Sequence, residues 1–170
     1  MKMIIIGERF NMPEHRAWHQ RAWDDHDWWV KVSLRAGAFN LPRDRDKFRL
    51  LGVEPDHCDS MNIVPPAPQG VPFDHLLARS IAQGVDWARW SIIIACGRHV
   101  QRALGVRRVE PGSLVGRALA VPHPSGLNRF WNDGAWVAEV SRAVQGHLRD
   151  VSRCPTRTGV VSIPPAGRTA

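Results

Sequence analysis

The fold of this chain is decided by the stretch Ala118-Leu119-Ala120-Val121-Pro122-His123-Pro124-Ser125-Gly126-Leu127-Asn128-Arg129. Its first four residues are apolar and predict a short buried strand. The two prolines beside His123 remove backbone donors and stiffen the chain, so we expect the histidine to be held in one place. Ser125-Gly126 permits a sharp turn. The stretch predicts either a loop that presents a fixed histidine for use or a plain strand-to-helix turn with a solvated histidine.

Three further apolar runs predict buried strands, at Lys2 to Ile6, Ser60 to Val64 and Trp90 to Cys96. Segments with helical spacing lie between them. Short apolar strands that alternate with helices favour parallel pairing with helices on both faces of the sheet. We therefore expect an α/β fold, a three-layer α/β/α sandwich with a central, mostly parallel four-stranded sheet.

The expected helices follow from capping residues and from the spacing of apolar side chains. They run over Glu14 to about Leu34 with a possible break, Arg43 to Leu51 closed by Gly52, Phe73 to Val85, Arg98 to Leu104 opened by Gly97, and Trp136 to Leu148. The chain of 170 residues is 44% apolar, which suits one domain with its own core. We expect this domain at 1–150, followed by a disordered tail at 151–170.

No apolar run is long enough to span a bilayer, and the N-terminal run is too short for a signal peptide. We therefore expect a cytoplasmic, monomeric protein. The three cysteines lie far apart, so we expect no disulfide framework and no zinc site. The neighbours His57, Cys58 and Asp59 have no second ligand pair at a suitable spacing. We expect no metal and no cofactor.

The formal net charge of the chain is +7, and much of the positive charge lies in and before the stretch Ala118 to Arg129. Between Gly97 and Arg129, Glu110 is the only acid, against the arginines Arg98, Arg102, Arg107, Arg108, Arg117 and Arg129. A local excess of this kind suits a polyanionic partner, although charge alone also fits an ordinary solvated surface.

Polar residues lie at the ends of three of the predicted strands. They are found in Gly7-Glu8-Arg9-Phe10-Asn11, Asp59-Ser60-Met61-Asn62 and His123-Pro124-Ser125. Because ligands of parallel α/β sheets bind beyond the carboxyl ends of the strands, we expect these side chains to meet at one edge of the sheet.

Taken together, these segments resemble the uracil-DNA glycosylase superfamily. His123-Pro124-Ser125-Gly126-Leu127-Asn128-Arg129 is similar to its second motif, and closest to the mismatch-specific branch. Gly7-Glu8 resembles the first motif, Asn62 with the prolines that follow resembles the asparagine that reads the flipped base, and 92–105 resembles a strand, glycine, helix and Leu-Gly segment. The resemblance runs in order from Met3 to about Arg149. The chain departs from the family at Arg9 and Phe10, where Asp, Asn or Ala followed by Pro is usual, and it lacks the four-cysteine iron–sulfur site of some branches.

The resemblance implies a DNA glycosylase that flips a base out of the stack and hydrolyses its N-glycosidic bond, leaving an abasic site. Such an enzyme needs a group that orients water near the sugar and a donor aimed at the departing base. Glu8 or Asn11 suits the first role and His123 the second.

The base-binding residues would be Asn62, Phe10, Arg9 and Ser125. The DNA-binding residues would be Gly126, Leu127, Asn128, Arg129 and Arg98, with Leu127 filling the space left by the flipped base. No lysine lies near the motifs in sequence, which argues against a Schiff-base lyase.

The base and the reaction class stay open at this point. In the classical uracil enzymes a tyrosine blocks substituents at the pyrimidine 5-position, and this chain contains no tyrosine. The substrate is therefore either uracil or a mismatched base, or a 5-substituted pyrimidine such as glucosylated hydroxymethylcytosine of phage DNA. The DNA is a duplex or a single strand. The alternatives are a catalytically inactive DNA-binding module on the same fold and a hydrolase of free nucleosides or nucleotides.

Overall fold

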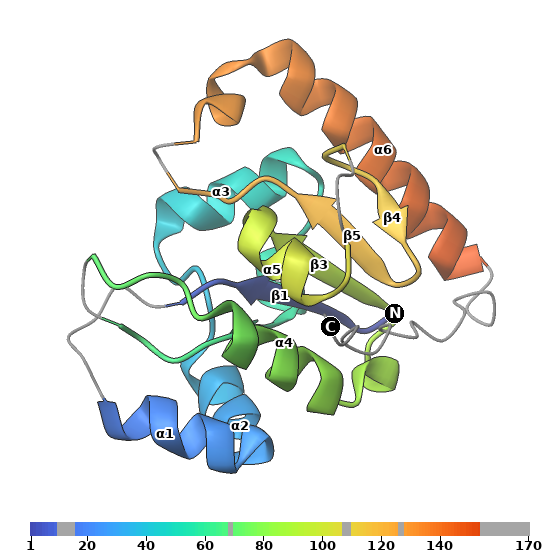
Figure 1. Cartoon of the computed structure of the whole chain (residues 1–170). Helices are drawn as coiled ribbons and strands as arrows, with labels where there is room; N and C mark the ends of the chain where they lie inside the picture. The colour runs from blue at the N-terminus through green and yellow to red at the C-terminus, as the bar shows by residue number, and fades with distance from the viewer. Residues whose placement is uncertain (10–15, 68–69, 107–109, 126–127, 154–170) are drawn as a thin grey trace, which may run out of the picture.

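The computed structural model describes residues 1–9, 16–67, 70–106, 110–125 and 128–153 (Figure 1). Its strands are β1 (Met3–Gly7), β2 (Asp59–Asn62), β3 (Ile92–Cys96), β4 (Leu114–Val115) and β5 (Ala118–Val121). Its α-helices are α1 (Arg16–Asp24), α2 (His26–Ala36), α3 (Pro42–Leu50), α4 (His75–Gly84), α5 (Gly97–Ala103) and α6 (Gly134–Arg153). Short 3-10 helices are η1 (Pro55–His57), η2 (Trp87–Arg89) and η3 (Arg129–Asn132).

The strands form one sheet in the order β2-β1-β3-β5-β4. The pairs β1–β2, β1–β3 and β3–β5 are parallel, and β4 pairs antiparallel with β5. The predicted α/β class and mostly parallel sheet are confirmed, whereas the predicted number of four strands is wrong because the sheet has five. The missed strand β4 is a two-residue edge strand, too short to leave a periodic pattern in the sequence.

Side chains alternate between two cores, as the two-residue period of a strand requires. In β1, Ile4 and Ile6 lie in the core covered by α1, α2, α4 and α5, whereas Ile5 lies in the core covered by α3 and α6. Figure 1 shows α4 and α5 on one side of the sheet and α6 on the other. With helices on both faces, the molecule is a three-layer sandwich.

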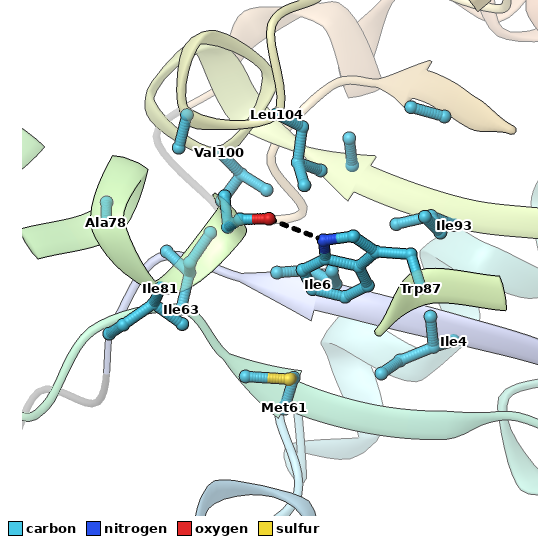
Figure 2. Packing of buried hydrophobic residues seen from close by; sticks show 14 of the residues in the cluster. Ile4, Ile6, Met61, Ile63, Ala78, Ile81, Trp87, Ile93, Val100 and Leu104 are labelled. Carbon is cyan, nitrogen blue, oxygen red and sulfur yellow. Dashed lines mark hydrogen bonds between the residues drawn. The ribbon is translucent and has the colours of Figure 1, made fainter. Parts of the chain in front are cut away.

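The chain contains eight tryptophans, an unusually large number, and several of them lie in the first of these cores. Figure 2 shows Trp87 among Ile4, Ile6 and Ile93, with its indole Nε1 donating to the carbonyl of Ala82 at 2.7 Å. Trp29 and Trp90 are fully buried. Each buried indole in this core has an acceptor for its N–H, which removes most of the cost of burying a polar atom.

Local capping explains most helix boundaries. The break expected between Glu14 and Leu34 occurs at Asp25, whose side chain accepts from the N–H of Trp28 and starts α2. α3 begins with Pro42, and Gly52 follows it with a positive φ of 74°. α6 continues past the expected start of the tail at Val151 to Arg153, and Val151 is buried in the second core. Residues 154–170 lie outside the described residues. No helix among those described is both long and apolar enough to cross a membrane.

Candidate active site

The candidate active site lies at the edge of the sheet where the parallel strands end. Glu8 directly follows β1, Gly97 directly follows β3, and His123 is two residues beyond β5. The chain passes from β1 to β2 on one side and then returns to β3 on the other side of β1. In parallel sheets, ligand sites lie beyond the carboxyl ends of the strands at such a reversal. The edge predicted from sequence is therefore the one at which these groups gather.

Glu8 and His123 approach each other across Gly97. A Cβ atom at Gly97 would lie 2.8 Å from Oε1 of Glu8 and 3.1 Å from Cβ of His123. Gly97 also has a positive φ of 81°, a conformation that L-residues with side chains rarely adopt. Glycine is thus required here twice, for backbone conformation and for the close approach of the two candidate catalytic groups.

The ring of His123 is oriented by its neighbours. Its Nδ1 accepts from the backbone N–H of Ser125 at 3.1 Å, so in the neutral imidazole the proton resides on Nε2. The ring of Phe39 packs edge-on against the imidazole at a centroid distance of 5.5 Å. His123 therefore offers Nε2–H as a hydrogen-bond donor, and the predicted base-binding residue Ser125 acts here through its backbone by fixing that tautomer.

The loop that carries His123 is anchored at two successive carbonyl groups. The carbonyl of His123 accepts from Asn128 Nδ2 at 3.1 Å and from Trp131 Nε1 at 2.9 Å. The carbonyl of Pro124 accepts from Lys47 Nζ at 2.6 Å. Asn128 was predicted to contact DNA. Its amide nitrogen is occupied within the loop, and its Oδ1 accepts from the N–H of Phe130.

Burial perturbs both candidate catalytic groups in the direction that suits their expected roles. Desolvation lowers the pKa of His123, against the partly opposing charges of Glu8 and Asp44. Desolvation raises the pKa of Glu8, and the positive charges of His123 and Arg9 offset part of that rise. Burial therefore favours the neutral imidazole of His123 and makes the carboxyl group of Glu8 more basic than an ordinary glutamate.

Asn62 lies at the end of β2, buried with 4% of its surface exposed. Its backbone carbonyl accepts from Ser33 Oγ at 2.9 Å and from Trp29 Nε1 at 3.2 Å, which fixes the strand end. Its Nδ2 is 3.5 Å from the carbonyl of Gly37, a weak contact, and its Oδ1 lies 2.5 Å from where a Cβ of Gly7 would be. The amide therefore extends along the strand ends toward β1.

Phe39 is a residue of the site that the sequence did not reveal. It has a φ of 55°, which is rare for a bulky side chain, and its ring lies between His123 and Phe48. The same ring would lie 3.0 Å from a Cβ of Gly7. Strained backbone of this kind concentrates at functional sites. No pattern around Gly37-Ala38-Phe39-Asn40 signals the role, because it depends on a loop between α2 and α3.

Helix α3 adds two charged groups near His123 that are far from it in sequence. Asp44 and Lys47 are three residues apart and so share a face of the helix. Asp44 influences the pKa of His123. Among the described residues its buried Oδ1 has no hydrogen-bond partner, and it forms an ion pair with Arg43 Nε at 3.9 Å. The expectation that no lysine lies near the motifs holds along the sequence and fails in space, because Lys47 contacts the His123 loop.

The remaining predicted residues divide into three groups. Arg9 donates to the carbonyl groups of Val71 at 2.7 Å and Pro72 at 3.4 Å, so it braces the loop before α4. Arg98 and Arg129 are exposed on elements that border the site. Four of them lie outside the described residues: Phe10, Asn11, Gly126 and Leu127. The choice between Glu8 and Asn11 as the group that orients water therefore stays a prediction, and of the two only Glu8 can be placed, beside Gly97.

The thiols and histidines of the described part of the chain form no metal-binding group of three or more ligands. Cys58 donates to the carbonyl of Glu54, and burial raises the pKa of its thiol to about 11. Asp59 beside it accepts from Trp90 and pairs with Lys2. These two residues are thus engaged with protein partners.

Comparisons with family models, with curated proteins and with solved structures found no match to this chain.

Proposed function

We propose that this protein is a monofunctional DNA glycosylase that removes a pyrimidine base and leaves an abasic site. The observation that carries the proposal is that the carboxyl group of Glu8 and the side chain of His123, whose neutral ring carries its proton on Nε2, both lie against Gly97. The resemblance of residues 123–129 to the second motif of the uracil-DNA glycosylase superfamily supports the same reading.

The arrangement fits the charge changes of N-glycosidic cleavage. As the bond breaks, the sugar becomes cationic and the departing base becomes anionic. The carboxylate of Glu8 stabilises the sugar and accepts a proton from the attacking water, which bonds to the sugar carbon. Nε2–H of His123 donates to the base as negative charge develops on it. The proton from water neutralises the departing base, so the reaction needs no metal and no redox partner.

Two further groups suit a flipped pyrimidine. The amide of Asn62 offers both a donor and an acceptor to the edge of the base. The ring of Phe39, half-buried between His123 and Gly7, offers an aromatic surface beside the same space. Within this class the substrate is uracil or a mismatched base, or a 5-substituted pyrimidine such as glucosylated hydroxymethylcytosine.

A panel of substrates tests the proposal and distinguishes its alternatives. Duplexes and single strands that contain uracil, thymine mismatches, hydroxymethylcytosine or glucosylated hydroxymethylcytosine are scored for alkali-labile sites and for free base. The free nucleosides and nucleotides are assayed beside them. The expected result is base release from at least one DNA substrate and from no monomer.

Other outcomes would replace the proposal. DNA binding without base release would indicate an inactive DNA-binding module, and release from monomers alone would indicate a nucleoside or nucleotide hydrolase. Lys47, which lies beside the His123 loop, supplies a specific control. Borohydride should trap no covalent complex between protein and DNA, whereas a trapped complex that disappears in Lys47→Gln would indicate a Schiff-base lyase.

A further inference from the structure

Next to the candidate active site, three aromatic rings contact one another across two helices. Phe73 stacks on His99 with a centroid distance of 4.7 Å and an interplanar angle of 21°. His75 lies 4.8 Å from His99 and 4.9 Å from Phe73. All three side chains are half-buried rather than enclosed in the core. We refer to Phe73, His75 and His99 as the ring cluster.

Helix packing fixes the ring cluster. His75 and Ala78 are three residues apart on α4, and Val100 follows His99 on α5. Ala78 and Val100 both belong to the first core, and Figure 2 shows Ala78 and Ile81 of α4 close to Val100 of α5. The two histidines are therefore held together by the core beneath them.

The surroundings of the ring cluster are cationic. Arg102 lies three residues after His99 on α5, so the two share a face of the helix. Arg9 donates to the carbonyl groups of Val71 and Pro72, directly before Phe73. Both charges act on His99, and that of Arg102 acts also on His75. No carboxylate of the described part of the chain forms an ion pair with either arginine. Two acids act on members of this group: Glu8 interacts electrostatically with Arg9, and Asp74 with His75. The side chain of Asp74 is engaged as the N-cap of α4, where it accepts from Leu77 N–H at 2.8 Å. His99 lies two residues after Gly97, against which Glu8 and His123 lie, so the cluster borders the candidate active site.

The neutral form of both histidines is favoured in the free protein. Burial lowers the pKa of His99, and Arg9 and Arg102 lower it further. Burial likewise lowers the pKa of His75, with His99 and Arg102 acting in the same direction and Asp74 against them. An anion placed among these groups would reverse the balance, because an opposite charge favours the protonated imidazole.

We propose that Arg9, His75, His99 and Arg102 form a phosphate-binding subsite, separate from the residues that cleave the bond. Guanidinium groups and imidazole N–H groups are suited to phosphate oxygens. Phe73 holds the ring of His99 by stacking. The inference rests on the proposed function, since it assigns the subsite to a phosphate of the same substrate whose base reaches Glu8 and His123. The phosphate belongs either to the DNA backbone or to a mononucleotide.

Titration of the histidines by NMR tests the subsite without requiring catalysis. The ring resonances of the full chain are followed between pH 5 and 8 with no ligand, with inorganic phosphate, with thymidine 5′-monophosphate, and with a duplex that contains no excisable base. We expect bound phosphate to raise the pKa of His75 and His99 by about one unit each, which corresponds to about tenfold tighter binding per proton taken up. His57, exposed in η1 before the amino end of β2, is the control and should not shift.

The arms of the experiment identify the source of the phosphate. A shift with the duplex but not with the monophosphate supports a backbone phosphodiester, and a shift with both small ligands supports a mononucleotide. If neither histidine shifts with any of the three ligands, the subsite is refuted.

Variants provide an independent measurement. Arg102 is exposed, so Arg102→Gln should fold normally, and it should reduce the slope of log affinity for duplex against log salt by about one. Arg149→Gln, on α6 across the sheet, should leave the slope unchanged.

The variant His75→Gln/His99→Gln should lose the pH dependence of binding. An unchanged slope in Arg102→Gln, or a retained pH dependence in the double variant, would overturn the inference. Base release without histidine shifts would refute the subsite alone, whereas histidine shifts without base release would refute the glycosylase.

Discussion

His123 combines three properties that are rarely found together in a solvated histidine. Its ring is packed against Phe39, its Nδ1 is occupied by a backbone N–H, and burial lowers its pKa. Protonation of Nδ1 would place a donor against the N–H of Ser125. The neutral tautomer with Nε2–H is therefore favoured, which argues against the plain strand-to-helix turn.

Replacing His123 by alanine tests its role as a donor. We expect His123→Ala to lower the single-turnover rate of base release about a hundredfold or more, the scale of losing one preorganised donor to a developing anion. DNA affinity should change little, because the ring contacts the base rather than the backbone. His57→Ala is the matched control, and a well-folded His123→Ala protein with near-normal turnover would refute the assignment.

Glu8 links activity to stability through its raised pKa. An acid whose pKa is higher in the folded protein binds its proton more tightly there. Its stabilising contribution is present below the ordinary value of 4.5 and is lost as pH rises through the folded value. At neutral pH the buried carboxylate therefore destabilises the fold, while its charge serves the proposed chemistry.

Glu8→Gln should separate these two effects. We expect a higher melting temperature than wild type at pH 7, no gain near pH 4, and strongly reduced base release at every pH. The wild-type rate should itself fall as pH decreases through the raised pKa of Glu8. Thermal unfolding at both pH values and a pH–rate profile provide the measurement. If Glu8→Gln remains active while Asn11→Ala is inactive, water activation belongs to Asn11.

At the scale of elements, side chains of α3 and η3 hold the carbonyl groups of His123 and Pro124 after β5. Trp131 of η3 donates to the carbonyl of His123, and its ring also lies 5.7 Å from the ammonium of Lys47. The position of the His123 imidazole thus depends on Trp131 and Lys47, side chains outside the proposed catalytic pair.

Trp131→Phe removes the indole N–H and keeps an aromatic ring. Losing one hydrogen bond of this kind costs about 1 kcal/mol, which lowers the melting temperature by about 2–4 °C in a chain of this size. Because His123 is less well positioned, we expect base release to slow roughly tenfold with unchanged DNA affinity. Trp136→Phe, at an exposed tryptophan of α6 that contacts Phe130, is the control and should retain the wild-type rate. Equal rates in both variants would contradict a positioning role.

The helices and strands also show which features of the structure can be predicted from the sequence and which cannot. The apolar runs at β1, β3 and β5 are long enough to predict buried strands, and Asp25 and Gly52 mark helix ends through local chemistry. β4 escapes prediction because two residues carry no period. The roles of Phe39, Asp44 and Lys47 escape it because they depend on how α3 and the preceding loop pack beside the strand ends.

For the whole molecule, parallel topology explains why residues far apart in sequence meet. The ends of β1, β3 and β5 must lie at one edge, so Glu8, Gly97 and His123 come together from three parts of the chain. That convergence follows from the strand pattern and is predictable. The orientation of each side chain at the edge is set by tertiary contacts, which no local pattern encodes.

The positive charge of the chain predicts salt-dependent association with DNA. Affinity for duplex should fall steeply as salt increases, because arginines that contact phosphates release condensed counterions. Arg129→Gln, at an exposed residue beside the His123 loop, should reduce the slope of log affinity against log salt by about one. Arg35→Gln, at the end of α2, should not. Association that is independent of salt would exclude DNA as the partner.

The central claim is that Glu8 and His123 act as a unit to hydrolyse an N-glycosidic bond. The most direct test is a double-mutant cycle in which single-turnover base release from the best DNA substrate is measured for wild type, Glu8→Gln, His123→Ala and the double variant. Groups that act on one transition state are not additive, so we predict that the double variant is about as slow as the slower single variant. Losses that multiply in the double variant, or base release that survives in all three variants, would contradict the account.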